Sequence, residues 1–354
     1  MTEAIDISIK RAQRSKLEDI NLENIPFGKY FTDHMLEADF DNGEWKNVSI
    51  RPYQPLSLEP SLAALHYGQA IFEGIKAYKD DKGNAYIFRP ADNFRRFNKS
   101  AERMNMPLVP EEIFMEGMRQ LIDIDKNWIP ARKDHSLYIR PVMFSTDEAL
   151  GVRPSQSYKF LIILSPTGPY FVNPMKIAVE ESYTRAAPGG VGFSKNAGNY
   201  GGSMLAATIA KEKGFDQVLW TDAFEHKWLQ EVGMMNVFFI IDNKVITPSL
   251  EEGTILEGVT RDSVITGLKE KGMQVEERKI SIDEVVAAYK AGKINEVFGT
   301  GTAAVIAPIK ELNYKGFAME FNPEQYKISS GVKTWLNDIR EGRIADKYGW
   351  MLKV

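Results

Sequence analysis

The 354-residue chain contains no cysteine, so it can form no disulfide and offers no thiolate nucleophile or thiolate metal ligand. Its 44 basic and 48 acidic residues leave a net charge of −4, which provides no basic field to hold a nucleic acid or an anionic membrane surface. No apolar run approaches the roughly 20 residues that a membrane-spanning helix needs. These absences favour a globular protein that acts on small molecules.

Several other features are also missing. The histidines are scattered without the spacing of paired ligands, so we expect no metal site; they are His34, His66, His135 and His226. Neither a Gly-x-Ser-x-Gly elbow nor a Gly-x-x-x-x-Gly-Lys-Ser/Thr loop occurs, which disfavours serine hydrolases and nucleotide triphosphatases. Residues 1–36 lack an apolar core of signal-peptide length and carry several acids, so we expect a cytoplasmic protein.

The composition is sufficient for two domains with substantial cores, since 44% of the residues are hydrophobic. Residues 165–174 contain three prolines and a glycine, which is typical of an interdomain connection. We therefore predict a smaller α/β domain with an N-terminal arm over 1–164, a linker over 165–174, and a larger domain over 175–354. A site is expected in the cleft between the two domains.

The periodicity predicts a mixture of helices and strands, an α/β (α+β) fold. Apolar residues at steps of three and four predict a helix over 91–104, and similar patterns predict helices at 111–124, 201–213, 259–271, 282–290 and 332–341. Runs of β-forming residues predict strands at 85–88, 136–144, 158–165, 175–183, 216–221, 296–298 and 303–306. Residues 235–241 and 244–247, joined by Asp242-Asn243, predict a hairpin.

Lys195 is the first candidate for chemistry, because glycines surround it within residues 189–202. Glycine lets a planar ligand approach the backbone, and a lysine amine in such a pocket can lose its proton and attack a carbonyl carbon. An aldehyde would then give a Schiff base. Taken alone, the same pattern also fits a solvated surface lysine in a flexible loop.

Three further groups would support a phosphorylated pyridine aldehyde. Glu231, followed by a run of apolar residues, is the candidate carboxylate for a protonated ring nitrogen. Tyr200, five residues after Lys195, is the candidate donor to the phenolic oxygen. The small-residue stretch 258–260 and Arg96 are candidate phosphate binders, and the stretch 299–303 could bind either the phosphate or a substrate carboxylate. Each of these residues, considered alone, is also compatible with an ordinary surface or core position.

A set of aromatic residues with one cation could line a pocket for an apolar amino acid; its members are Tyr67, Phe72, Tyr138, Arg140 and Tyr170. The order of all these groups along the chain is informative. The stretches 65–74, 195–200, 231–233, 258–261 and 299–303 read LHYGQAIFEG, KNAGNY, EVG, GVTR and GTGTA. From roughly Phe31 to its C-terminus, the chain resembles the branched-chain amino-acid aminotransferases.

The resemblance implies a two-domain fold-type IV architecture, pyridoxal 5′-phosphate as cofactor, and a homodimer whose active sites borrow residues from the partner. It implies that Lys195 is the Schiff-base lysine, that Tyr200 bonds the phenolic oxygen, and that Glu231 pairs with the ring nitrogen. Leu256 would pack against the ring. The implied phosphate binders are Arg96, Val259, Thr260 and Thr302. The implied substrate positions are Phe72, Tyr138, Arg140, Tyr170, Thr302 and Ala303, with Tyr67, Leu150 and Val152 serving the neighbouring subunit's site.

Two departures from the family pattern concern substrate preference and regulation. Many relatives carry threonine three residues after the ring-nitrogen glutamate, whereas this chain has Met234, so a hydroxyl contact near the substrate is lost. Some animal relatives carry a Cys-x-x-Cys pair where this chain has Ala304 and Ala307, so regulation through thiols is excluded.

The resemblance therefore implies an enzyme that moves the amino group of L-leucine, L-isoleucine or L-valine to 2-oxoglutarate, giving L-glutamate and a branched-chain 2-oxo acid. Two alternatives remain at this stage. Another fold-type IV activity, D-amino-acid transamination or aminodeoxychorismate lysis, would use the same lysine and ring-nitrogen acid. A non-catalytic anion-binding protein on the same scaffold is the alternative from a different class.

Overall fold

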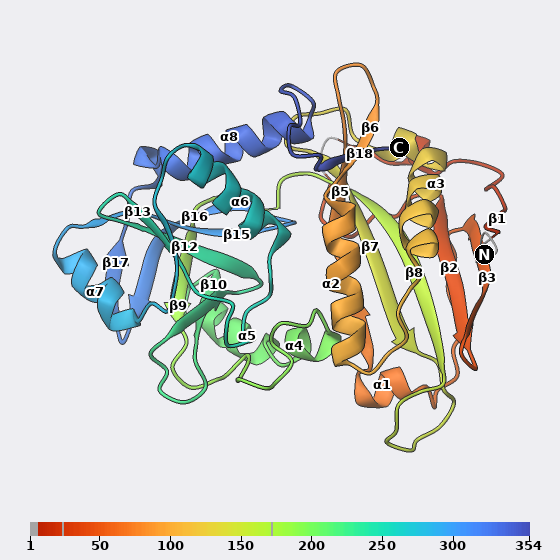
Figure 1. The fold of residues 1–354 in the computed structure, drawn as a ribbon, viewed down its shortest axis with the longest axis horizontal. Helices are drawn as coiled ribbons and strands as arrows, with labels where there is room; N and C mark the ends of the chain where they lie inside the picture. Colours follow the sequence, from red (N-terminus) through yellow and green to blue (C-terminus); the bar gives the residue numbers. More distant parts are fainter. Residues whose placement is uncertain (1–5, 23–24, 171–172) are drawn as a thin grey trace. The chain divides into compact units, whose positions relative to one another are not determined.

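The computed structural model describes residues 6–22, 25–170 and 173–354 (Figure 1). By internal contacts the chain divides into two compact units. The first unit holds the described residues up to Tyr170, together with Ser194–Ala197 and Asp338–Val354. The second holds the described residues from 173 to Phe193 and Gly198–Asn337. Residues 1–5 of the predicted N-terminal arm and 171–172 of the predicted linker lie outside the described part.

A nine-stranded sheet, counted over the described residues, is the centre of the first unit, in the order β1-β3-β2-β8-β7-β5-β6-β18 with β4 beside β7. Its strands are β1 (Ser8–Ile9), β2 (His34–Asp41), β3 (Glu44–Pro52), β4 (Ala70–Phe72), β5 (Ile75–Lys79), β6 (Ala85–Phe88), β7 (Ser136–Ser145), β8 (Ser157–Thr167) and β18 (Met351–Lys353). The pairing is antiparallel except between β1 and β3.

Helices α2 (Pro90–Arg103) and α3 (Gly117–Ile124) lie against this sheet (Figure 1). Pro90 occupies the first turn of α2, where a missing N–H costs nothing, and the buried face of the helix includes Phe97 and Ala101. Phe97 packs against Phe160 of β8 with ring centroids 5.5 Å apart. The unit also contains α1 (Ala63–Tyr67), the 3-10 turns Leu17–Asp19 and Lys126–Trp128, and a π-helical turn at Glu112–Glu116.

The second unit is built on another sheet, nine-stranded over the described residues, in the order β11-β10-β9-β16-β15-β12-β13-β14 with β17 beside β16. Strand β11 pairs with both β10 and β12, so part of the sheet closes into a ring. The strands are β9 (Met175–Val179), β10 (Gln217–Thr221), β11 (Leu229–Val232), β12 (Met235–Ile241), β13 (Lys244–Thr247), β14 (Val275–Glu277), β15 (Ile294–Gly301), β16 (Val305–Tyr314) and β17 (Phe317–Glu320).

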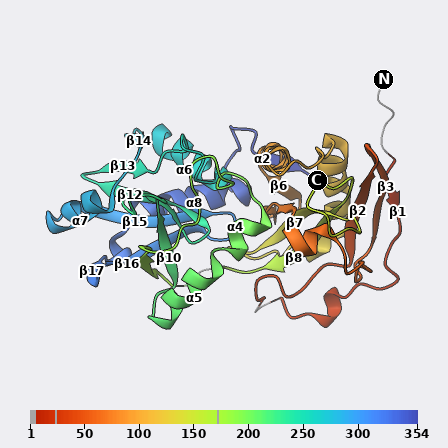
Figure 2. The same cartoon turned by 90° about the horizontal axis from the view of Figure 1, so that it is seen from below.

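Helices α6 (Val259–Glu270) and α8 (Ile328–Arg340) pack closely in this unit and lie side by side in Figures 1 and 2. A Cβ on Gly267 of α6 would lie 2.4 Å from the Trp335 ring of α8, so only glycine permits this approach. The remaining helices are α4 (Ala197–Gly201), α5 (Met204–Glu212), α7 (Ile282–Lys290) and the 3-10 turn Pro323–Gln325.

The predicted hairpin is present as β12 and β13, and its two turn residues have positive φ, 50° at Asp242 and 62° at Asn243. This conformation is the one that short hairpin turns require, and Asp and Asn tolerate it. The helix predicted over 91–104 and the strand predicted over 136–144 agree with α2 and β7 to within a residue at each end.

Several predicted boundaries are wrong. The strand expected over 175–183 ends at Val179, because the Glu180 carboxylate accepts hydrogen bonds from the next three backbone N–H groups and turns the chain. The helix expected over 201–213 begins three residues later, as α5, and Gly201 is the last residue of the separate helix α4. The strand expected over 303–306 begins at Val305 and runs to Tyr314.

The division into units also differs from the predicted domain boundaries. Residues 165–167, placed in the linker by their composition, belong to strand β8. The last residues, 338–354, belong to the first unit and not to the predicted second domain, because β18 pairs with β6. Over the described residues, no helix has the length and apolar character to cross a membrane, and no cluster of acids and histidines suits a metal ion.

Candidate functional site

Lys195 is attached to the first unit through its backbone. Its N–H donates to the Ser100 hydroxyl of α2 at 2.9 Å, and its carbonyl accepts the N–H of Phe72 at 3.0 Å. The next residue, Asn196, forms a β-bridge with Ile71. The side-chain amine lies 4.8 Å from the centre of the Phe72 ring. The glycine-rich sequence therefore holds this lysine in one place beside β4, unlike a mobile surface loop.

A buried ion pair lies on the same unit. Arg96 donates Nε and Nη2 to the two oxygens of Glu73 at 2.7 and 2.8 Å, and Asn93 donates to Glu73 at 2.8 Å. Burial raises the pKa of Glu73, but the charge and hydrogen bonds of Arg96, with smaller contributions from Lys195 and Asn93, hold it below its ordinary value. Glu73 was not predicted as a site residue, although it stands between Phe72 and Gly74 in the recognised motif.

Four of the predicted substrate residues gather on the first unit. The Arg140 guanidinium lies 4.6 Å from the centre of the Phe72 ring and 5.3 Å from that of Tyr138, and it donates to the Tyr138 hydroxyl at 2.8 Å. Phe27 joins Tyr138 to Tyr170, with ring centroids 4.9 and 5.0 Å away. Sequence reasoning missed Phe27, because it lies in the N-terminal arm, where no periodic pattern marks it.

Gly74 explains how the Tyr138 ring reaches this cluster. A Cβ at Gly74 would lie 2.2 Å from the Tyr138 hydroxyl oxygen, closer than any real contact. The glycine after Phe72 and Glu73 is therefore required for the close approach of an aromatic side chain. Together these residues form an apolar and aromatic surface with a single cation, suited to a hydrophobic side chain and one carboxylate.

Glu231 lies in the second unit, on strand β11, and is buried. Its Oε1 accepts the backbone N–H of Leu256 at 2.9 Å, and its Oε2 lies 3.0 Å from Nη2 of Arg185. Asn236 donates to Oε1 at 3.4 Å and to the Leu256 carbonyl at 3.0 Å. Each oxygen of the Glu231 carboxylate therefore has its own partner, and these partners fix the orientation of the carboxylate. Arg185 was missed in the sequence, since nothing in its local pattern distinguishes it from a surface arginine.

The predicted phosphate binders of this unit lie at two chain turns. Gly258 is the N-cap of α6 and provides no side-chain cap, and Val259 and Thr260 of the first turn are buried. A Cβ on Gly258 would lie 2.0 Å from the Asn236 amide oxygen. A glycine-led helix start of this kind suits a phosphate, because the backbone N–H groups and the helix dipole favour an anion.

Thr302 and Ala303 form the turn between β15 and β16. The Thr300 hydroxyl, just before this turn, is buried and has no hydrogen-bond partner in the described part of the chain. Val305, just after the turn, has a φ of 61°, which is strained for a β-branched residue. Tyr200 lies on α4 and is half-buried. Leu256, which lies before α6, is also half-buried.

Tyr67, Leu150 and Val152 form a separate group on the first unit. The Tyr67 hydroxyl donates to the Leu150 carbonyl. Their exposed fractions are 45%, 62% and 85%, respectively.

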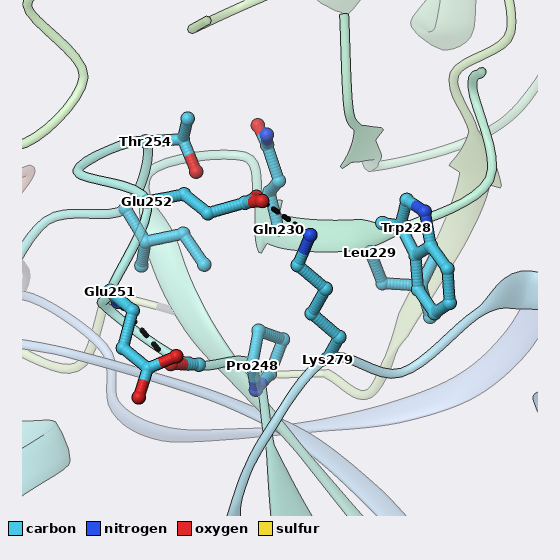
Figure 3. Close-up of a pocket in the computed structure, with 10 residues that line it drawn as sticks. Trp228, Leu229, Gln230, Pro248, Glu251, Glu252, Thr254 and Lys279 are labelled. Carbon is cyan, nitrogen blue, oxygen red and sulfur yellow. Dashed lines mark hydrogen bonds and ion pairs between the residues drawn. The ribbon is translucent and has the colours of Figure 1, made fainter. Parts of the chain in front are cut away.

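Figure 3 shows a small pocket in the second unit, which is lined in part by Leu229 and Gln230 of β11. It encloses about 20 Å³, room for about one water molecule. The Gln230 amide oxygen is buried without a partner among the described residues, and Lys279 pairs with Glu252. No predicted site residue lines this pocket, so we assign it no part in the chemistry.

Known proteins share both sequence and fold with this chain. The family model described as "Amino-transferase class IV" matches residues 70–312, more than half of the chain. The chain belongs to the class IV aminotransferases. This membership confirms the resemblance, the fold class and the prediction of an enzyme that uses pyridoxal 5′-phosphate.

Among the relatives, a probable branched-chain-amino-acid aminotransferase of Staphylococcus epidermidis is 47% identical over 353 residues, covering 98% of each chain. Branched-chain-amino-acid transaminase 1 of Bacillus subtilis is 47% identical over 337 residues, covering 94% of each chain. A crystal structure of the branched-chain aminotransferase of Escherichia coli matches with a TM-score of 0.75 at 27% identity, covering 90% of this chain and 98% of that one.

A further solved structure bears on the cofactor. It is a branched-chain amino acid aminotransferase in complex with N-(5′-phosphopyridoxyl)-L-glutamate, and it matches with a TM-score of 0.72 at 27% identity, covering 89% of this chain and 97% of that one. This chain has the types of residue that could hold a phosphorylated pyridine group. They provide an amine, an oriented carboxylate, and a glycine-led helix start with a buried threonine.

Proposed function

We propose that this aminotransferase transfers the amino group of L-leucine, L-isoleucine or L-valine to 2-oxoglutarate, giving L-glutamate and the branched-chain 2-oxo acid. The names of its relatives, at 47% identity over nearly their whole length, support this substrate class. The observation that carries the proposal is the cluster of Phe72, Tyr138, Arg140 and Tyr170, joined by Phe27, beside the amine of Lys195.

Pyridoxal 5′-phosphate, when bound, supplies an electron sink that stabilises negative charge on the α-carbon of the amino acid. We assign Lys195 to its aldehyde carbon, Glu231 to its ring nitrogen and Tyr200 to its phenolic oxygen. Leu256 would pack against the ring, and Arg96, Val259, Thr260 and Thr302 would hold the phosphate. The pairing of Arg96 with Glu73 supports a role in which the guanidinium is kept charged and fixed in direction.

The nucleophilic lysine also moves the proton. As a neutral amine, Nζ of Lys195 takes the proton from the substrate α-carbon, a general-base step. The backbone bonds of Lys195 to Ser100 and Phe72 restrict where that amine can reach. A fixed base within reach of one carbon contributes mainly through orientation.

The residues of the proposed substrate pocket explain why branched-chain amino acids would bind there. The rings of Phe72, Tyr138 and Tyr170 exclude water from a branched aliphatic side chain. Arg140 provides the cation for a substrate carboxylate. Thr302 and Ala303 are the proposed substrate contacts of the second unit, where Met234 replaces the threonine that many relatives carry.

We further propose that the enzyme works as a homodimer in the cytoplasm and that Tyr67, Leu150 and Val152 serve the partner's site. Their exposure as apolar side chains supports a docking role. Light scattering on the purified protein is expected to give twice the chain mass of 40.1 kDa. A monomer that is fully active would contradict this assignment.

The substrate assignment is tested with L-leucine and 2-oxoglutarate. We expect L-glutamate and the branched-chain 2-oxo acid, with no product from D-alanine. Activity with D-alanine alone would show instead that the enzyme is a D-amino-acid aminotransferase. Release of pyruvate from aminodeoxychorismate would show that it is an aminodeoxychorismate lyase.

The cofactor assignment is tested by reducing the loaded enzyme with borohydride and mapping the labelled peptide. We expect the label on Lys195, and we expect Lys195→Ala to remove the yellow absorbance. The exposed Lys213→Ala serves as the control and should retain both. A colourless, unlabelled wild-type protein would favour a non-catalytic anion-binding protein.

A further inference from the structure

Arg185 lies in the second unit, in the segment that follows β9, and its side chain is only 8% exposed. Its Nη2 lies 3.0 Å from Oε2 of Glu231. The same nitrogen donates to the backbone carbonyl of Thr254 and, at 3.4 Å, to that of Gly192. One buried guanidinium therefore faces the acid that we assign to the ring nitrogen.

The other oxygen of Glu231 is held from a different direction. Oε1 accepts the N–H of Leu256 at 2.9 Å and the side-chain amide of Asn236 at 3.4 Å. A carboxylate offers about four acceptor directions. With a cation on one oxygen and an amide on the other, the plane of the Glu231 carboxylate is fixed.

The charge of Arg185 is as important as its hydrogen bonds. A buried acid avoids ionisation unless an opposite charge lies close to it, and a guanidinium does not lose its proton in proteins. The Nε of Arg185 is buried and has no hydrogen-bond partner among the described residues. The guanidinium thus stays buried beside Glu231 even though one of its donors is unsatisfied.

We propose that Arg185 is a positioning residue of this enzyme, which holds Glu231 ionised and oriented so that its carboxylate accepts a hydrogen bond from the protonated ring nitrogen of the cofactor. The proposal rests on the assigned role of Glu231. Arg185 itself takes no proton and touches no reacting atom. Its effect on the reaction passes through the protonation of the ring nitrogen, on which the electron-withdrawing power of the cofactor depends.

A purely structural role for Arg185 is the alternative, since its bonds to Gly192 and Thr254 also tie two loop segments together. Ring-nitrogen protonation distinguishes the two roles. The cofactor is labelled with ¹⁵N in its ring and bound to each variant, and the ¹⁵N chemical shift is followed against pH. A protonated and a neutral pyridine nitrogen give separate shifts, and a change in loop packing alone does not convert one into the other.

In Arg185→Gln we expect the ¹⁵N signal at pH 7 to move towards the neutral form, and kcat to fall by about tenfold or more with a smaller change in KM. Arg185→Lys keeps the positive charge but loses the planar guanidinium with its several N–H donors. Its ¹⁵N signal should therefore lie between those of the wild type and Arg185→Gln. If Arg185→Gln does not fold, the comparison of Arg185→Lys with the wild type carries the test.

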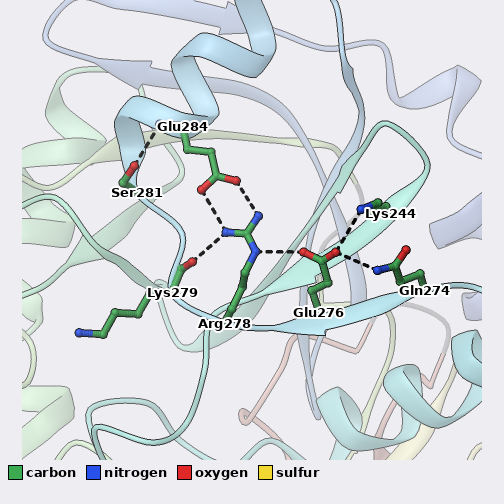
Figure 4. A network of polar contacts seen from close by, with 7 residues as sticks. All are labelled: Lys244, Gln274, Glu276, Arg278, Lys279, Ser281 and Glu284. Atoms are coloured by element: carbon green, nitrogen blue, oxygen red, sulfur yellow. Dashed lines mark hydrogen bonds and ion pairs between the residues drawn. The ribbon is translucent and has the colours of Figure 1, made fainter.

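The matched control is Arg278→Gln. Arg278 is also an arginine of the second unit, and it pairs with Glu276 and Glu284 (Figure 4). Among the described residues, none of its hydrogen-bond or ion-pair partners is a predicted site residue. This variant should retain the wild-type ¹⁵N signal. Loss of thermal stability in either Arg185 variant with an unchanged ¹⁵N signal would overturn the proposal and leave a structural role.

The variant Glu231→Gln tests the proposed role of Arg185 separately from the proposed role of Glu231 at the ring nitrogen. If Glu231→Gln shifts the ring-nitrogen signal and neither Arg185 variant does, only the role of Arg185 fails. If Glu231→Gln leaves the signal unchanged, the ring-nitrogen role of Glu231 itself is wrong, and the proposal for Arg185 falls with it.

Discussion

At the scale of single residues, the charged side chains near the candidate site are paired in ways that fix their direction. Arg96 lies against Glu73, and Arg185 lies against Glu231. Both acids are buried, and each pair joins residues that are distant in the sequence. Such pairs add specificity of geometry more than net stability, because desolvation offsets much of the attraction between the charges.

Removing one member of a buried pair should nevertheless be costly. Glu73→Gln leaves the Arg96 charge without its counter-ion, and we expect a loss of about 3 kcal/mol in the free energy of unfolding by urea at pH 7. The pKa of Glu73 is lower in the folded protein than in the unfolded chain. The ionised Glu73 therefore adds to the free energy of unfolding above its unfolded pKa, and this stabilisation is lost as the pH falls through the folded pKa.

Glu37→Gln is the matched control for this change. Glu37 forms the same two-pronged contact with Arg51 in the first unit, at 2.5 and 2.7 Å, but the two side chains are 18% and 17% exposed. We expect a loss of less than about 1 kcal/mol. Equal losses in the two variants would contradict the view that burial sets the cost.

Asp222 provides a second test at this scale. Burial raises its pKa, but four backbone N–H groups, from Phe224, Glu225, Lys227 and Trp228, outweigh this and lower it to about 2. Its stabilising effect is therefore complete above pH of about 4 and is lost as the pH falls towards 2. We expect Asp222→Asn to lower Tm at pH 7 and to show a smaller further loss between pH 4 and pH 2 than the wild type. The exposed Asp81→Asn should follow the wild-type curve.

At the scale of elements, the helix starts depend on groups that come from elsewhere in the chain. The N-terminus of α8 is capped by Glu296 of β15, whose carboxylate accepts the N–H groups of Lys327, Ile328 and Ser329 at 2.6 to 2.8 Å. The N-terminus of α6 has only Gly258 at its cap and no capping side chain. One helix start is thus satisfied within the protein, and the other suits an anionic ligand.

Glu296→Gln should weaken the start of α8. A glutamine presents one amide donor in place of an acceptor oxygen and loses the charge that favours a helix N-terminus, so we expect a loss of about 1 to 2 kcal/mol. Hydrogen exchange of the amides at 327–329 should speed up in this variant. Glu320→Gln, on the exposed strand β17 of the same sheet, is the control and should leave their exchange unchanged.

The elements also show how far sequence patterns reach. The hairpin β12-β13 and helix α7 could be predicted to the residue, because Asp242-Asn243 and the period of three to four residues are local signals. The separate helix α4, which ends at Gly201 just before α5, could not be predicted. Neither could the length of β16, whose pairing with β9, β15 and β17 extends it beyond the short apolar run.

At the scale of the whole molecule, the first unit is assembled from distant parts of the chain. Ser194–Ala197 and Asp338–Val354 join it, although both follow the first residues of the second unit. Strand β18 pairs with β6, and the Trp350 carbonyl accepts the N–H of Arg89 at 2.7 Å. The last residues of the chain thus complete the sheet against which α2 and the segment of Lys195 lie.

Deleting residues 349–354 should therefore destabilise the first unit and not the second. We expect faster hydrogen exchange in β6 and in the first turn of α2, because the backbone of β6 loses a partner strand. The hairpin of residues 235–247 is the internal reference and should exchange at the wild-type rate. Uniform acceleration across both units would contradict this division of the chain.

The sequence by itself determined the kinds of groups available and their order along the chain. The lysine among glycines, the acid before an apolar run, the small-residue turns and the lack of cysteine are all local or compositional, and they sufficed for the family, the cofactor and the reaction class. Only the tertiary structure decided that Arg96 faces Glu73, that Arg185 faces Glu231, that Phe27 joins Tyr138 to Tyr170, and that β18 belongs with β6. These contacts connect residues far apart in the chain, and periodicity describes only the geometry of near neighbours.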